Sequence, residues 1–358
     1  MKHIILILMF PLFSSIGYSQ TQSAEQQIED LVRQGITFHD KGDFDNAIKF
    51  YDKALEIDNN SFLVLSEKAM TLVSLQRYNE AIEHCRKAIE ISPNHKLAAF
   101  TYVTYGTAHD LLQQPEKSLE VYEKGITLFP DYSMLYFNKA ITLTKMNQID
   151  EAILSLKQAL YLKPTHPGSH NALARLLEAK NQRIPAILAY CRFLTLELRS
   201  QRAEENLGYL QKTMNANVRK KEDNSIQIFV NPKVINDTAS AEFKSELDFL
   251  TLEMLLSIDA AMDHVNDSVN KTEFSIFLRK IKHLFSVLKA MKSKGSGFYW
   301  NYYVPFFIEM HEKNFVEAFA YAAYTSKSTP ETSQWIKENQ QLIKDYINWS
   351  TSYEWPKK

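Results

Sequence analysis

Small and aromatic residues recur among polar ones at helical spacing between Gly42 and Asn60. Ala47, Tyr51 and Ala54 fall on one face of the helix that this spacing predicts. The two alanines let a neighbouring helix approach, and the tyrosine fills the space between them. Because glycine readily adopts the backbone conformation that ends a helix, Gly42 is predicted to end the preceding helix. The pattern therefore predicts the second arm of a helical hairpin.

The first arm lies upstream, and the whole frame returns along the chain. Leu31, Gly35 and Phe38 form the apolar stripe that faces the second arm. One hairpin cannot bury its own apolar face, so it needs neighbours. The frame recurs about every 34 residues, more faintly in its last copy: Leu65, Ala69, Leu72, Tyr78, Ala81, Cys85, Ala88 and Pro93; Tyr102, Gly106, Tyr122, Gly125 and Pro130; Tyr136, Ala140, Leu143, Ala152, Leu156, Ala159 and Pro164; Leu173, Ala174, Leu177, Ala186 and Tyr190.

This frame resembles the tetratricopeptide repeat (TPR) family, in which a large residue, Leu-Gly and an aromatic are followed by Ala, an aromatic, Ala and Pro. The resemblance covers about residues 28 to 200. It implies an all-α fold, a solenoid of about five hairpins, and residues 201–214 are expected to form a terminal capping helix. It also implies that the array binds a protein or peptide partner in a concave groove lined by the first helix of each repeat.

The resemblance assigns ten residues to this groove, and the middle of the set is apolar. Family members that hold a partner's terminal carboxylate use lysines and asparagines at these places, and this chain lacks that set. The ligand is therefore expected to be an apolar or aromatic segment, of another protein or of this chain's own C-terminal part. The candidates are Met70, Val73, Phe100, Val103, Thr107, Met134, Phe137, Ile141, Asn171 and Arg175.

The composition changes after the repeats. Residues 215–225 are polar and charged and are expected to be a linker, so we predict a repeat domain over 28–214 and a mostly helical C-terminal domain over 226–358. Ile226 to Val230 is a candidate strand. A short linker more easily places a domain at the end of a stack than inside its groove, which favours a groove open to a partner.

Two helices of opposite charge are expected in the C-terminal domain. Acidic residues dominate between 240 and 267, and basic residues dominate between 271 and 292. A basic amphipathic helix can bind membranes or anionic polymers. The acidic helix before it offers an intramolecular partner, and we favour the antiparallel pair.

Phe298 to Phe307, FYWNYYVPFF, is the most aromatic stretch of the chain. It is either the core of the C-terminal domain, or its seam with the repeats, or a platform for a sugar or peptide. Aromatic clusters more often pack than bind, so we favour the core. Asn314 to Tyr324 resembles the second helix of a degenerate repeat.

The N-terminal residues predict export. Lys2 precedes an apolar run from Ile4 to Phe13, and small residues stand before Gln20. This is the pattern of a secretory signal peptide over residues 1–19, cleaved near Ser19/Gln20. The run is too short to span a membrane as a helix. The mature protein is expected in the periplasm or outside the cell, without a membrane span.

Charge and cysteine content narrow the function classes. The chain carries 41 basic and 42 acidic residues, a net charge of −1, which does not favour nucleic-acid binding. Cys85 and Cys191 fall three repeats apart and are expected to be two buried free thiols.

No catalytic, cofactor or metal site is convincing in this sequence. His311-Glu312 begins like a zinc protease helix, but Phe315 stands where the second histidine is needed. His166 and His170 are four apart, yet the Pro-Gly pair between them puts the first in a turn. We therefore predict a non-enzymatic binding scaffold without cofactor or metal. The alternative is an enzyme or carbohydrate-binding module in the C-terminal domain, with the repeats as its recruiting arm.

Overall fold

The computed structural model describes residues 14–222, 225–229, 241–265, 272–292, 295–327 and 329–357, with side chains from Ala24 on except those of 241–248 and 265. The chain forms two compact units, Met1–Asn147 and Gln148–Lys358. Lys2 and the apolar run of the predicted signal peptide lie outside the described residues. Residues 14–19 are helical. The signal peptide stays a prediction.

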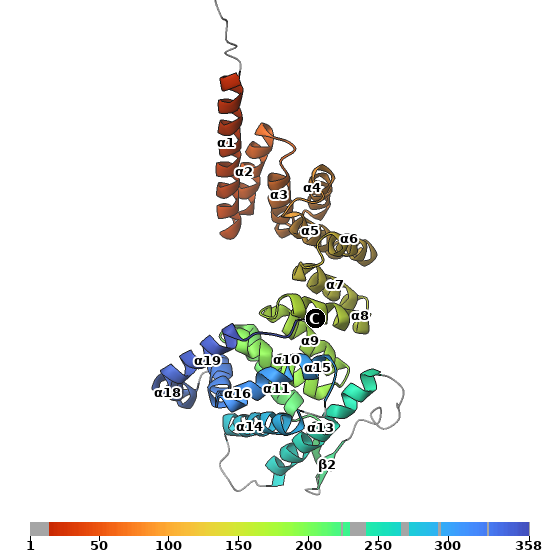
Figure 1. Cartoon of the computed structure of the whole chain (residues 1–358), viewed down its shortest axis with the longest axis vertical. Helices are drawn as coiled ribbons and strands as arrows, with labels where there is room; N and C mark the ends of the chain where they lie inside the picture. Colours follow the sequence, from red (N-terminus) through yellow and green to blue (C-terminus); the bar gives the residue numbers. More distant parts are fainter. Residues whose placement is uncertain are drawn as a thin grey trace, which may run out of the picture. The chain divides into compact units, whose positions relative to one another are not determined.

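The first unit consists of consecutive helices in which each packs on the next (Figure 1). They are α1 (Ser14–Asp40), α2 (Phe44–Ile57), α3 (Phe62–Ser74), α4 (Tyr78–Ile91), α5 (Ala98–Leu111), α6 (Pro115–Leu128) and α7 (Ser133–Lys145). The predicted hairpins are therefore present, each made of a first and a second helix.

The same turn closes each hairpin. Gly42, Gln76 and Gln113 have positive φ angles of 77°, 61° and 58°. The amide of the following residue donates back across the turn, as in Arg77 N to Leu72 O at 2.9 Å. This is the bonding pattern of a helix that ends on a left-handed residue. Glutamine fills the position in two hairpins, so the turn does not require glycine.

Small residues face buried tyrosines inside the hairpins. Tyr51 and Tyr122 are 0% and 1% exposed. A Cβ atom added to Gly35 would lie 2.8 Å from Tyr51 Cζ, and one added to Gly106 would lie 2.6 Å from Tyr122 Cζ. Both distances are shorter than a van der Waals contact, so the ring occupies the space that the glycine leaves open. This confirms the packing that the pattern of small residues and tyrosines predicts.

The second unit begins with four more helices of the array and continues into the C-terminal part. Its elements are α8 (Ile149–Leu162), α9 (Pro167–Ala179), α10 (Arg183–Leu196), α11 (Gln201–Met214), β1 (Val218–Lys220), β2 (Ile226–Ile228), α13 (Ala241–Val265), α14 (Glu273–Met291), α15 (Phe298–Tyr302), α16 (Val304–Glu312), α17 (Val316–Ala323), the 3₁₀ turn η1 (Tyr324–Lys327), α18 (Pro330–Glu338) and α19 (Gln340–Ser352). The predicted all-α fold class is confirmed. A helix is present at residues 201–214, and its role as the cap of the array stays a prediction.

The α10 helix is the centre of this unit. Every residue from Arg183 to Thr195 is buried. The helix contacts α9 and α11 on the side of the array, and α13 and α17 of the C-terminal part. A helix that is apolar all round has to be covered all round. The last repeat and the C-terminal part therefore share one core.

The compact units thus divide at Asn147 and not at the predicted linker. Residues 218–220 and 226–228 pair as an antiparallel hairpin, with Val218 opposite Ile228, and both strands contact α13. The candidate strand at Ile226 is present, and its partner lies inside the predicted linker. The predicted domains, as parts that fold independently, stay a prediction.

The acidic and basic helices, α13 and α14, pair with each other as predicted. Arg279 forms ion pairs with Asp259 and Asp263, and Lys280 contacts Asp263 at 2.7 Å. His283 Nδ1 lies 3.5 Å from Asp259. Later residues of α14 meet earlier residues of α13, so the helices are antiparallel. Much of the basic charge of α14 is neutralised by ion pairs within the chain. This makes membrane binding by α14 a less favoured interpretation.

The C-terminal part contains one further hairpin with the same turn. Asn314, between α16 and α17, has a φ of 59°. The amide of Phe315 donates to Met310 O at 2.9 Å, which matches the pattern at Arg77 and Leu72. The degenerate repeat expected at Asn314 to Tyr324 is thus the second helix of a hairpin whose first helix is α16.

Candidate functional site

The face formed by the first helices of the first unit holds eight of the ten predicted groove residues. They occupy equivalent helix positions: Val103 and Thr107 flank the close-approach residue Gly106 in α5, and Phe137 and Ile141 flank its counterpart in α7. Met70 and Val73 lie on α3, Phe100 lies on α5 and Met134 lies on α7. All eight side chains are half-buried. We call these eight residues the apolar face.

Polar groups also lie on the first helices of this unit. His39 Nδ1 lies 2.8 Å from Thr71 Oγ1. Burial raises the pKa of the Glu67 carboxyl, and the nearby Asp40 charge raises it further. At the end of α5 the mostly buried carboxylate of Asp110 pairs with Lys145.

The Thr107 side chain of the apolar face is already engaged. Thr107 Oγ1 lies 3.2 Å from the hydroxyl of Tyr122, whose pKa burial raises to about 12. The hydroxyl pair ties the face to the tyrosine that fills the space at Gly106.

The two remaining candidates belong to the second unit. The Arg175 guanidinium carbon lies 3.7 Å from the centre of the Tyr209 ring of α11. Asn171 is half-buried, and its Oδ1 is a buried atom without a hydrogen-bond partner. The structure therefore places Met70 to Ile141 in one unit and Asn171 and Arg175 in the other, and Arg175 packs against the capping helix.

The aromatic run Phe298–Phe307 is buried in the second unit, where it meets the last repeats. The buried members are Tyr299, Trp300, Tyr302, Tyr303, Phe306 and Phe307. The Tyr302 hydroxyl donates to Leu160 O of α8 at 2.9 Å, and the Tyr161 ring packs edge-on against Tyr302. The favoured assignment as core and seam is confirmed, and these six rings are not exposed as a sugar platform.

His170 is a structural member of this seam. Its Nε2 lies 2.9 Å from Pro164 O, and its Nδ1 lies 2.7 Å from the Tyr303 hydroxyl. Because a carbonyl only accepts, Nε2 carries the proton and Nδ1 accepts from the tyrosine. Burial, with the nearby Arg192 charge, holds the His170 pKa well below its usual range. The imidazole is therefore neutral and fully occupied. His166 instead caps α9 by accepting from Ser169 N at 3.2 Å.

Two features of the second unit were not found by the sequence reasoning. Arg192 is a fully buried cation on α10, and Trp355 packs on its guanidinium with the ring centre at 4.6 Å. An arginine in the middle of an otherwise apolar helix was a signal for the first. Nothing local marked Trp355, because its partners lie far away in the sequence.

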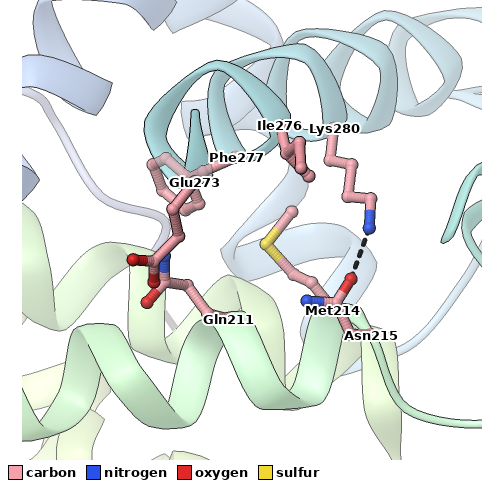
Figure 2. A pocket seen from close by; sticks show the side chains of 7 residues that line it. All are labelled: Gln211, Met214, Asn215, Glu273, Ile276, Phe277 and Lys280. Atoms are coloured by element: carbon pink, nitrogen blue, oxygen red, sulfur yellow. Dashed lines mark hydrogen bonds between the residues drawn. The ribbon is translucent and has the colours of Figure 1, made fainter. Parts of the chain in front are cut away.

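A small cavity of about 110 Å³ lies between α11 and α14 (Figure 2). Lys280 reaches across it to hydrogen-bond Asn215, and its ammonium also pairs with Asp263. Burial lowers the pKa of Lys280. The ammonium is already held by both partners, so the cavity is a packing defect between two helices and not a reaction site. The other lining residues are Gln211, Met214, Glu273, Ile276 and Phe277.

The chemistry of the remaining candidates is limited. Within the described ranges, no group of three or more His, Cys, Asp or Glu side chains is placed to hold a metal ion. Cys85 and Cys191 are free and buried, as predicted, and burial raises the pKa of both thiols. Of the helices that the structure describes, none has the length and apolar character to cross a membrane.

Comparison with known proteins decides the family of the array. Three tetratricopeptide repeat models match residues 31–61, 60–131 and 121–153. This segment is a tetratricopeptide repeat array. The matched repeats cover α2 to α7 completely, together with parts of α1 and α8.

Curated relatives of the TPR array include a protein STIP1 homolog of Dictyostelium discoideum, 30% identical over 127 residues, which are 34% of this chain and 22% of that protein. An Hsp70-Hsp90 organizing protein of Triticum aestivum is 30% identical over 140 residues, 36% of this chain and 22% of that protein. This chain thus spans about a fifth of the length of these two relatives.

Solved structures align with the TPR array at low identity. A TPR protein of Thermus thermophilus has a TM-score of 0.44 and 21% identity, covering 52% of this chain and 98% of that one. YrrB, described as a TPR protein with an unusual peptide-binding site, has a TM-score of 0.39 and 19% identity, covering 54% and 97%.

Proposed function

We propose that this protein is a scaffold that binds a protein or peptide partner on the apolar face of its TPR array and catalyses no reaction of its own. The partner is a segment with apolar or aromatic side chains. The relatives that carry similar repeats include proteins named for organizing Hsp70 and Hsp90, which supports a protein partner.

The observation that carries the proposal is the exposure of apolar side chains at equivalent positions of consecutive first helices. Val103, Phe137 and Ile141 are half-buried although each stands beside a fully packed position. Contiguous apolar surface on a repeat array is costly in water unless a partner covers it. A helical or extended segment that presents apolar side chains at regular spacing would match this face.

The proposal is tested by selecting ligands from a random peptide library displayed on phage with the full chain as bait. The expected result is a set of peptides rich in aromatic and aliphatic residues. Phe137→Ala should weaken the binding of these peptides about tenfold or more, as loss of a central aromatic anchor does. Leu128→Ala is the matched control, because Leu128 is 43% exposed on a second helix.

Two outcomes would contradict the proposed face. Selected peptides that are mainly charged would show that its apolar character does not choose the ligand. Equal binding by the parent and the Phe137→Ala protein would show that the ligand lies elsewhere.

We also propose that the protein is exported, with the mature chain beginning near Gln20. Lys2, the apolar run after it and the small residues before Gln20 support this. Mass spectrometry of the protein from the native host's periplasm or medium tests it. A protein that retains residues 1–19 would contradict the proposed cleavage.

A further inference from the structure

The segment that follows α19 inserts one side chain into an aromatic cage. Residues 353–357 have no regular secondary structure, and within the described part of the chain no backbone hydrogen bond holds them. The Trp355 ring lies 4.8 Å from Tyr302, 5.1 Å from Phe306 and 4.6 Å from the guanidinium carbon of Arg192. We call residues 353–357 the strap. His170, Arg192, Tyr302, Tyr303 and Phe306 are the Trp355 cage.

Arg192 is the charged centre of the cage. It is fully buried, and burial lowers its pKa to about 10. Its Nη1 donates to Thr195 Oγ1 at 3.0 Å and to Ser350 O at 3.4 Å. Within the described ranges, its Nε and Nη2 have no hydrogen-bond partner. Among the described residues no carboxylate pairs with it, so the faces of Phe306 and Trp355 are what compensates the cation.

The strap is an incomplete occupant of this cage. Trp355 is only half-buried, and its Nε1 is a buried donor that has no acceptor among the residues that the structure describes. Glu354 and Lys357, on either side, are exposed. The tryptophan thus covers the guanidinium with an aromatic face but supplies no acceptor for Nε and Nη2. Buried donors of a charged group that stay unpaired are costly.

Glu354, which precedes Trp355, is exposed, so the missing acceptor is expected from the residue that follows the ring. We propose that the Trp355 cage is a binding site for a partner peptide in which an aromatic residue is followed directly by Asp or Glu, and that Trp355 fills the site in the absence of the partner. The aromatic ring of the partner takes the place of the indole between Tyr302, Phe306 and Arg192. The carboxylate accepts from Nε and Nη2 of Arg192, a planar pair of donors that suits a carboxylate. The cage lies in the second unit, so this site is separate from the apolar face.

The strap competes with such a partner from within the molecule. A tethered side chain acts at an effective concentration in the millimolar range, so it masks the cage from weak ligands. Removing the indole should therefore unmask the cage without changing the fold, because Trp355 is half-buried and stands on a segment without regular secondary structure.

The experiment measures the fluorescence anisotropy of labelled heptapeptides with the full chain. The probes are the peptide of residues 351–357, TSYEWPK, the same peptide with Trp355→Ala, and two peptides with Pro356→Asp or Pro356→Asn. The proteins are the parent, Trp355→Ala, Trp355→Ala with Arg192→Met, and Trp335→Ala. The last is the matched control, because Trp335 is also half-buried but stacks on Tyr321 at 3.8 Å, outside the cage.

The Trp355→Ala protein should bind the TSYEWPK peptide about tenfold tighter than the parent or the Trp335→Ala protein. It should not bind the peptide that lacks tryptophan. The peptide with Asp should bind about five- to tenfold tighter than the peptide with Asn, since a charged acceptor strengthens the hydrogen bonds of Arg192. Arg192→Met should remove that difference.

Three results would overturn the proposal. The first is a Trp355→Ala protein with an unchanged circular dichroism spectrum that binds no peptide. The second is equal affinity for the Asp and Asn peptides, which needs no arginine variant and so stays decisive if Arg192→Met does not fold. The third is an Asp preference that persists in a folded Arg192→Met protein.

Discussion

Replacing Gly106 by alanine tests the packing of the TPR array most directly. An added Cβ would lie 2.6 Å from Cζ and 2.8 Å from Cδ1 of Tyr122. Cε1 of the same ring lies closer still. An ordinary contact needs about 3.4 Å or more, so the ring would have to move by about 1 Å or more. Tyr122 is 1% exposed and its hydroxyl meets Thr107 at 3.2 Å. The ring has no open space to move into.

Two opposing effects determine how much Gly106→Ala changes the free energy of unfolding. Alanine stabilises a helix interior by about 1 kcal/mol relative to glycine. Overpacking a tight core costs about 1 to 3 kcal/mol. Gly106→Ala should therefore lower the free energy of unfolding by up to about 2 kcal/mol, despite the gain in helix propensity. A loss of that size lowers Tm by several degrees in a unit of about 150 residues.

Gly208→Ala is the matched substitution with the opposite expected sign. Gly208 lies inside α11, and nothing lies within 4 Å of its added Cβ. Only the propensity term acts there, so this variant should be more stable by about 1 kcal/mol. A variant that combines Gly106→Ala with Tyr122→Leu should lose less than the sum of the two single changes, because the smaller side chain relieves the clash.

The assay is urea unfolding followed by far-ultraviolet circular dichroism. The chain has two compact units, so midpoints are compared and not one extrapolated free energy. A Gly106→Ala midpoint above that of the parent, as is expected of Gly208→Ala, would refute the reasoning, because it would mean that the Tyr122 ring does not fill the space beside the glycine. The reasoning would also be refuted if the stability losses of Gly106→Ala and Tyr122→Leu simply added up in the combined variant.

Three further predictions use the same measurements. Ala152 is 0% exposed, so Ala152→Leu should lower the free energy of unfolding by about 1 to 3 kcal/mol, and Ala152→Ser should lower it less. Equal thermal midpoints for the parent and the leucine variant would contradict the assignment of Ala152 to a close contact between helices. Trp300 is 4% exposed and stacks on Phe249 at 4.7 Å, so Trp300→Ala should cost about 3 to 5 kcal/mol in urea unfolding, and a loss below about 1 kcal/mol would contradict its place in the core. The pKa of Glu67 is raised by burial and by Asp40, so folding favours its protonated form and stability falls as the pH rises through the pKa of the folded state. The Glu67→Gln variant should therefore exceed the parent in stability by more at pH 7 than at pH 4. An equal difference between their urea midpoints at both pH values would contradict the raised pKa of Glu67.

Local chemistry was enough to predict the TPR array. Each hairpin repeats small residues where helices touch, a tyrosine or other large residue between them, and a turn after a fixed number of residues. These requirements act between neighbours along the chain, so they leave a period in the sequence. The charge of α13 and α14 predicted their antiparallel pairing for the same reason, because the two helices are consecutive.

The end of the array was harder to predict, because α10 has the repeat signature on one side and an apolar surface on all others. The signature suggested an ordinary last repeat, whereas Ile187, Phe193 and Leu194 require cover that only the C-terminal part supplies. The continuous apolar run of this helix was a signal that a domain boundary at the linker did not account for.

The sequence by itself determined the all-α class, the hairpin frame, the helix at residues 201–214 and the aromatic core, because each follows from periodicity or from burial of large side chains nearby. Only the tertiary structure decided that the last repeats and the C-terminal part share one core, that Arg192 lies unpaired among rings, and that Trp355 covers it. These contacts join residues more than 100 positions apart, such as Arg192 and Ser350. No local pattern encodes such a pair, since each partner only has to fit a surface that forms when the whole unit folds.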